Sequence, residues 1–363
     1  MKSLALLTSL ISASHYAAAY QFRPETDTAY WKVSVTLDRQ TGIPLTNSSP
    51  ASPSYSTSVS QLPDTTTATS SYWTSSYITS TDNQQYLVIS HLLIGPENRS
   101  CYRASALNLH NPAVYTTTIA YTSSPVLETG PHFRATVRSS GFEGLSADNV
   151  AQMRTFSADS LRLTFDLTYA ATSTALANGG MGLFSFGGGR TYEWGLPNCV
   201  TAGSAMINGQ RVLVDPARSF TWYDRQWSEP GAAVTGNWTW FELHVAGSRD
   251  RLSVWAIDGV GRARFRFATI RREDGAQIVV PVGFGADYTR QWYSRASGTL
   301  YPLDWVVTMG EHGVLRVASI VGDQEIAGNT AFSTAYKGFV TFDGQFEGQK
   351  VDGFGVVEIV FSE

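Results

Sequence analysis

Short segments in which apolar and polar residues alternate recur along most of the chain. The clearest is Leu161–Leu167, where every second position is Leu or Phe. A period of two is typical of a β-strand with one buried face. Further segments of strand character are residues 86–91, 113–121, 132–138, 252–257, 263–270, 277–282, 306–309, 314–320, 338–342 and 353–360. Turn residues separate them at intervals of about 8–12 residues. We therefore expect an all-β protein built from sandwiches or barrels.

The length and the charge limit both the organisation and the partners. A chain of 363 residues with 43% hydrophobic residues predicts roughly two domains, although one large β-domain is the alternative. The net charge is only −4, and no run of Lys or Arg occurs. We therefore expect neither nucleic acid nor an anionic membrane surface as a partner. The sequence does not predict an oligomeric state.

The first residues have the pattern of a secretory signal peptide. Lys2 is followed by the apolar run Leu4–Ile11 and by Ala17–Ala19, an A-x-A cleavage pattern before Tyr20. Residues 1–19 are predicted to be removed, and a short buried strand or helix is the alternative. No other apolar run reaches the roughly 18 residues that span a bilayer. We expect a soluble protein of the secretory pathway, either secreted or held in a vesicle or vacuole lumen.

The cysteines and the glycosylation motifs are interpreted for a protein of the secretory pathway. Cys101 and Cys199 either form one disulfide or remain two buried thiols. Asn47, Asn98 and Asn237 each begin an Asn-x-Ser/Thr acceptor motif. No Cys/His cluster occurs and the six His are scattered, so neither a metal nor another cofactor is predicted.

Two aromatic segments carry the strongest indication of function. Trp222–Trp227 and Trp238–His244 together contain four Trp, a Tyr, an Arg, a His and two carboxylates. A carboxyl group among indoles is poorly solvated, which raises its pKa from about 3.9 toward neutrality and makes it a proton donor. Asp224 is therefore the first candidate for a catalytic acid. The alternative is a structural ion pair of Asp224 and Arg225, or an exposed face with interfacial Trp.

Strand alternation predicts which of these side chains act together. Trp222, Asp224 and Gln226 share one face of an extended strand, and the even-numbered residues of 238–244 share one face of the next. Residues 241, 243 and 245 are apolar and can join a core. Two polar aromatic faces that oppose each other would form a cavity with acids and a His.

Other residues complete the expected site. Glu193, between Tyr192 and Trp194, repeats the pattern of an acid between aromatic residues, and we predict that Glu193 or His244 relays the proton. The expected substrate-binding residues are Trp222, Tyr223, Trp227, Trp240, Glu242, His91 and Trp73. A buried, satisfied His is the alternative for His91. Glu358, in an apolar closing strand, is expected at the solvent face. The Gly-rich residues 178–189 lack the Lys-Ser/Thr of a phosphate loop and predict turns or bulges.

The segment Trp222–Trp227, followed by Trp238–Leu243, resembles the signature of hydroxyneurosporene synthase (carotenoid hydratase) and AttH-like, lipocalin-related proteins. Residues 86–91 and 353–358 fit the same pattern, and the resemblance covers most of the mature chain. The secreted fungal branch includes proteins similar to kievitone hydratase, and related fungal cyclases include Diels–Alderases. Ser228 stands where bacterial members have Gly.

The resemblance implies an architecture and an activity. It implies two packed lipocalin-like β-barrel or β-sandwich domains, which we place at residues 20–230 and 231–363, with a ligand pocket and no cofactor. It implies that Asp224 protonates an alkene or epoxide of a prenylated or polyketide small molecule, which then undergoes hydration, cyclisation or rearrangement. Two alternatives remain at this stage: an intramolecular [4+2] cyclase that works by shape, and a non-catalytic carrier of a lipophilic metabolite.

Overall fold

A computed structural model describes residues 19–25, 57–62, 69–95, 99–228, 236–258 and 264–361. In this part of the chain, strands form two antiparallel sheets, and the α-helix is a single turn, α1 (Thr57–Ser60). The all-β prediction is confirmed. Residues 1–18 of the predicted signal peptide, Asn47 and Asn98 lie outside the described residues.

The first sheet contains the strands from residue 70 to residue 228. Their order is β4-β3-β2-β1-β14-β12-β9-β8-β7-β6-β5, and β10, β11 and β13 pair with β12. The bounds are β1 Ser70–Thr79, β2 Gln85–Ile94, β3 Ser100–Asn108, β4 Tyr115–Thr122, β5 Val126–Thr129, β6 Phe133–Val137, β7 Ser140–Gly144, β8 Gln152–Ser157, β9 Leu163–Ala171, β10 Leu176–Ala177, β11 Leu183–Phe186, β12 Gly189–Ile207, β13 Gln210–Leu213 and β14 Phe220–Ser228. The sheet curls so that β2 contacts β6, β7 and β8 across a core that includes Tyr72, Phe142 and Leu167.

The second sheet contains the strands from residue 237 onward. Their order is β18-β17-β16-β15-β24-β23-β21-β20-β19, and β22 pairs with β23. The bounds are β15 Asn237–Val245, β16 Arg251–Asp258, β17 Arg264–Arg271, β18 Gln277–Pro281, β19 Gly283–Tyr293, β20 Leu300–Thr308, β21 Gly313–Ser319, β22 Glu325–Ile326, β23 Ala335–Phe346 and β24 Gln349–Val360. Phe241, Leu243 and Val245 face its core together with Trp305, as the alternation in β15 predicts.

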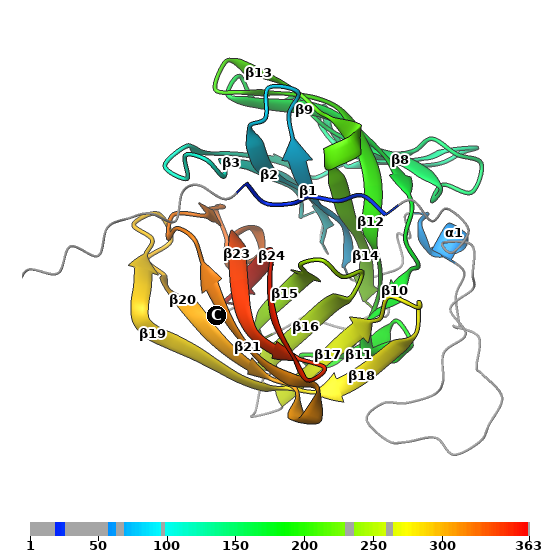
Figure 1. The fold of residues 1–363 in the computed structure, drawn as a ribbon. Coiled ribbons are helices and arrows are strands. Elements are labelled where there is room, and N and C mark those ends of the chain that lie inside the picture. The colour runs from blue at the N-terminus through cyan, green and yellow to red at the C-terminus, as the bar shows by residue number, and fades with distance from the viewer. Residues whose placement is uncertain are drawn as a thin grey trace, which may run out of the picture.

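The two curled sheets face each other (Figure 1). A third cluster of buried, mainly aromatic side chains lies between them. It contains Trp73 and Trp222 from the first sheet and Trp240, Trp255 and Phe339 from the second. The aromatic faces expected to oppose each other therefore do so. The chain passes between the sheets after β14 and before β15, and the predicted boundary at residues 230 and 231 lies outside the described residues.

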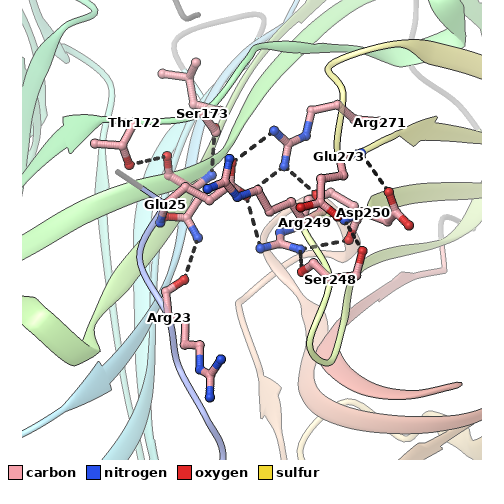
Figure 2. Close-up of polar contacts among 12 residues, drawn as sticks. Arg23, Glu25, Thr172, Ser173, Ser248, Arg249, Asp250, Arg271 and Glu273 are labelled. Atoms are coloured by element: carbon pink, nitrogen blue, oxygen red, sulfur yellow. Dashed lines mark hydrogen bonds and ion pairs between the residues drawn. The ribbon is translucent and has the colours of Figure 1, made fainter. Parts of the chain in front are cut away.

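The segment of residues 19–25 runs between the two sheets (blue in Figure 1). Phe22 packs against Phe220 of the first sheet and Phe354 of the second. The Glu25 carboxylate accepts hydrogen bonds from Arg271 at 2.8 and 3.1 Å (Figure 2) and lies 3.1 Å from Arg251 Nη2. The segment thus ties the sheets together.

The structure also bears on the predictions for the Gly-rich stretch, the cysteines and the glycosylation motifs. The Gly-rich stretch forms turns: η1 (Asn178–Gly180), with Gly179 at a φ of 67°, and the β11–β12 hairpin. Cys101 and Cys199 are buried free thiols and not a disulfide. Asn237 is exposed at the start of β15. Among the described residues, no helix is long and apolar enough to cross a membrane.

Candidate active site

A cavity of about 280 Å³ lies between the two sheets. Aromatic and apolar side chains form much of its wall, and a few buried polar groups reach it. The predicted site residues that line it are Trp73, His91, Glu193, Asp224, Trp227 and Trp240. Further lining residues include Ser71, Arg103, Phe186, Gln226, Trp238, Trp255, Phe332 and Glu358.

On the first sheet, five in-register residues form a row across neighbouring strands. Arg103 on β3 pairs with His91 on β2, which pairs with Trp73 on β1. Trp73 pairs with Asp224 on β14, which pairs with Gly195 on β12. Directly opposed residues in a sheet project from the same face, so the row presents a base, a His, an indole and an acid to the cavity.

A second row faces it from the other sheet. Lys337 on β23 pairs with Glu358 on β24, and Glu358 pairs with Trp240 on β15. Trp240 in turn pairs with Trp255 on β16. The rows meet where the Lys337 amine lies 3.7 Å from the centre of the Trp73 ring, and where the Trp73 and Trp240 rings meet edge to face at 5.6 Å. The site is therefore basic at one end and acidic and aromatic at the other.

Asp224 is a buried acid without a counter-ion. Only 4% of the residue is exposed, and neither carboxyl oxygen has a hydrogen-bond partner among the described residues. Burial raises the pKa of Asp224 well above its usual value. The nearby indole N–H of Trp222 offsets part of this rise, and the negative charge of Glu358 adds to it. A β-carbon at Gly195 would collide with Asp224 Oδ1, so glycine makes room for the carboxyl group. Asp224 is therefore protonated at pH values at which an ordinary Asp is ionised.

Glu193 is the second acid at this end. It lies on β12, opposite Gln226 of β14, and its Oε2 has no hydrogen-bond partner in the described structure. Burial raises the pKa of Glu193 well above its usual value, and the charges of Asp224 and Glu358 add to the effect. Two nearby carboxyl groups cannot easily ionise together, so they titrate as a pair. The pair can donate one proton and accept another.

At the basic end, Glu358 is an ion-pair partner and not the solvent-facing residue that we expected. Its Oε1 lies 2.8 Å from Lys337 Nζ and 3.5 Å from Arg103 Nη2. The expectation was wrong because β24 lies inside the second sheet, between β15 and β23, with this face against the first sheet. Burial alone would raise the pKa of Glu358, but the charges of Lys337 and Arg103 outweigh it and lower the pKa.

His91 connects this end to the cavity as a neutral imidazole. Burial lowers the pKa of His91 well below its usual value, and the charges of Lys337 and Arg103 lower it further. Arg103 Nη2 lies 3.1 Å from His91 Nδ1, and Lys337 also contacts this atom. Because Nδ1 faces donors, the proton is assigned to Nε2, which donates to Ser71 Oγ at 2.9 Å.

Four predicted site residues do not line the cavity. Tyr223 points to the opposite face of β14, into the core of the first sheet, and its hydroxyl donates to Gln61. Trp222 and His244 pack against each other between the sheets. Glu242 accepts hydrogen bonds there from Ser75 and Tyr77.

Sequence reasoning missed Arg103, Lys337 and Ser71. A weak signal existed for the two bases, because each is a single basic residue inside a strand of mainly apolar and small residues. A long cation within such a strand requires a buried partner. No such signal marks Ser71 among its many Ser and Thr neighbours.

The described part of the chain contains no group of three or more His, Cys, Asp or Glu side chains placed to hold a metal ion. The chemistry that its own side chains offer is proton transfer by Asp224 and Glu193. The indoles of Trp73 and Trp240 lie in the same aromatic layer and can stabilise a positive charge.

Known proteins share this architecture over nearly the whole chain. The AttH-like family matches residues 116–360. The chain is 42% identical over 356 residues to kievitone hydratase of Fusarium solani subsp. phaseoli, covering 96% of this chain and 93% of that protein. It is 36% identical over 370 residues to dehydratase asqC of Emericella nidulans, covering 99% and 98%.

A solved structure gives the same result. The crystal structure of kievitone hydratase from Nectria haematococca superposes with a TM-score of 0.83 at 36% sequence identity, covering 94% of this chain and 98% of that one. Because the match covers nearly all of both chains, it supports the lipocalin-like fold as well as the sequence relationship. By its sequence and its fold, this chain belongs to the AttH-like family.

Proposed function

We propose that this protein is an enzyme that adds water to, or removes water from, a lipophilic small molecule by acid–base catalysis. The observation that carries the proposal is the Asp224 carboxyl group, which is buried, has no counter-ion and faces the cavity beside a second acid. The names of the two relatives, a hydratase and a dehydratase, support the same reaction class.

In the hydration direction, Asp224 transfers its proton to one carbon of an alkene, and the π electrons form the new C–H bond. The neighbouring carbon becomes cationic. A water molecule then forms a C–O bond to the cation, and the Asp224–Glu193 pair takes up the proton that this water loses. Dehydration is the reverse: the pair protonates the hydroxyl group, water leaves, and a carboxylate removes a proton from the adjacent carbon. Positioned acids and bases of this kind contribute about 10²–10⁴-fold to a rate.

The aromatic wall supports this route. The rings of Trp73 and Trp240 lie near the acidic end of the cavity and meet each other at 5.6 Å. A ring face stabilises a nearby cation by about 0.5–2 kcal/mol. The same rings exclude bulk water, so the position at which a single water enters decides between hydration and cyclisation. Protonation of an epoxide followed by rearrangement would use the same residues.

The test is turnover of candidate alkenes and tertiary alcohols in heavy-oxygen water, followed by mass spectrometry of the product. We expect the wild-type protein to incorporate the label and Asp224→Asn to lose activity. Asp166→Asn, which removes an exposed carboxylate from β9, is the matched control and should remain active.

Other outcomes of this experiment would indicate a different function. With an alkene as the substrate, an isomeric product without the label would indicate cyclisation or rearrangement, whereas an alkene formed from an alcohol carries no label and indicates dehydration. A ligand that is bound but recovered unchanged would indicate a carrier. Asp224→Asn with a wild-type rate would refute the assignment of Asp224.

A further inference from the structure

The cavity reaches the protein surface beside a loop of the second sheet. This loop, residues 327–334, joins β22 to β23 and contains the single turn η5 (Ala331–Ser333). Ala331 and Phe332 line the cavity together with Leu93 of β2 and Arg99, the residue before β3. Ala331 and Arg99 are exposed and Phe332 is half-buried, so this part of the wall is a mouth of the cavity. The rim of the mouth therefore comes from both sheets.

Hydrogen bonds fix the position of this loop. Thr330 and Ser333 form a reciprocal capping box around η5. Tyr121 belongs to β4, the edge strand of the first sheet. Its hydroxyl accepts a hydrogen bond from the Asn329 N–H at 2.9 Å and donates one to Ser333 Oγ at 3.3 Å. Because the loop is fastened both to itself and to the opposite sheet, the fold places Phe332 before a ligand enters.

Phe332 reaches across the mouth to Gly95, the residue that follows β2. A β-carbon at residue 95 would lie 2.9 Å from Phe332 Cζ, so the ring rests against the backbone of the first sheet, where a larger side chain would displace it. The Gly95 N–H donates to the Arg99 carbonyl oxygen at 2.9 Å and closes the backbone of this turn. The ring thus connects the second sheet to the first at the rim.

We propose that Phe332 is a specificity-determining residue, a fixed aromatic lip that limits the length of the apolar ligand that the cavity encloses. Methylene groups inside the lip leave water, and each raises the affinity about fourfold. Groups that extend past the lip remain in water and add nothing. The inference goes beyond the proposed function, because it rests on the contacts of the mouth and holds whether or not the enclosed ligand reacts.

The test uses a series of unbranched primary alcohols, from 1-butanol to 1-dodecanol, whose dissociation constants are measured by isothermal titration calorimetry. For the wild-type protein we expect the affinity to rise with chain length and then to level off. Phe332→Ala should move this limit to a longer alcohol and leave the affinities of the short alcohols unchanged, and Phe332→Trp should move it to a shorter one. Tyr293→Ala removes an exposed ring that does not line the cavity and is the control.

The opposite shifts of the two variants cannot result from misfolding, because a damaged fold weakens the binding of every alcohol. The lip is overturned if the wild type binds no alcohol or shows no limit, if both variants keep the wild-type limit, or if they lower all affinities equally. Asp224→Asn separates this inference from the proposed function. Full turnover by that variant would refute the acid and leave the length limit in place, whereas its loss of turnover, together with a limit that ignores residue 332, would refute only the lip.

Discussion

Two clusters of buried carboxyl groups between the sheets, one around Glu25 and one around Asp224, are built in opposite ways. Glu25 is surrounded by donors: Arg271 holds it in a fork (Figure 2), and Arg251 adds a third contact. Asp224 and Glu193 are equally buried, but neither has a cation beside it, and three of their four carboxyl oxygens lack partners in the described structure. The first group is an ion-pair network, and the second is a pair of acids held in an unfavourable environment.

Under the proposed function, the difference separates residues that stabilise the fold from residues that transfer protons. A paired charge keeps two elements in place, and its removal leaves its partners unsatisfied. An unpaired acid lowers the stability of the folded state and retains a proton that it can transfer. Substitutions in the two groups should therefore move activity and stability in different directions.

The largest effect is expected for Asp224→Asn. The amide keeps the shape of the carboxyl group but cannot donate the proton, so we expect a loss of turnover of about 10²–10⁴-fold. The variant should also be more stable than the wild type at neutral pH, because it no longer exposes a readily ionised group on unfolding. Turnover and thermal unfolding, measured on the same preparation, test the expected loss of activity and the expected gain in stability. A variant that loses both activity and stability would contradict the view that the buried Asp224 carboxyl group destabilises the folded protein.

Glu25→Gln should have the opposite signature. It leaves Arg251 and Arg271 without their buried carboxylate, and breaking a buried pair from one side costs about 3–5 kcal/mol. Denaturant unfolding measures this loss. Turnover per folded molecule should remain close to that of the wild type, since Glu25 does not line the cavity. A specific loss of turnover in the folded protein would contradict the division of roles.

Gly195→Ala tests the fit around the acid. The added methyl group would collide with Asp224 Oδ1, and crowding of a packed site costs about 1–3 kcal/mol. We expect turnover to fall by more than tenfold because the carboxyl group must move. Gly209→Ala is a control, since a β-carbon there meets no neighbour within 4 Å, although its φ of 82° brings backbone strain of its own. Equal turnover in the two variants would show that the position of Asp224 is not critical.

Trp240→Leu should have a smaller effect. Leu keeps the position apolar but removes the ring face, so a cationic transition state loses about 1.4 kcal/mol, or tenfold in rate. Trp305→Leu, in the core of the second sheet, controls for the loss of a large buried ring. If Trp240→Leu lowers substrate affinity alone, the ring serves binding and not charge stabilisation.

The smallest effect concerns the pH dependence of stability. The pKa of Asp224 is higher in the folded protein than in the unfolded chain, so its contribution is fully present below the unfolded pKa of about 4 and is lost as pH rises through the folded pKa. Above pH 5, the wild type should lose stability relative to Asp224→Asn by about 1.4 kcal/mol for each pH unit until the pH reaches the folded pKa. If the difference in the free energy of unfolding between the two proteins does not change with pH, the raised pKa of Asp224 is contradicted.

The sequence was informative wherever a local pattern decides the outcome. Alternation in residues 222–227 correctly separated Asp224, which faces the cavity, from Arg225, and it predicted the core face of β15. Tyr223 was assigned to substrate binding in spite of that same alternation, and the structure shows that the alternation was the better guide.

The pairing of distant strands could not be predicted from such local patterns. Arg103 and Lys337 meet because β3 and β23 belong to different sheets that pack face to face, and no periodicity records the sheet order or the register. Glu358 was expected at the solvent face because β24 was taken for an outer closing strand. The placement of β24 next to β15 depends on contacts more than 100 residues apart along the chain.

The two opposed rows give the site a modular design. Each residue of the two rows stands on a different strand, and the backbone spacing is set by hydrogen bonds that do not depend on the side chains. A single substitution can therefore exchange one group, such as the base on β3 or the indole on β15, without displacing the others. Moving a group to the neighbouring strand changes its distance from Asp224 by a fixed step of about 4.8 Å. Diversification of substrates on such a frame would proceed in discrete steps of length.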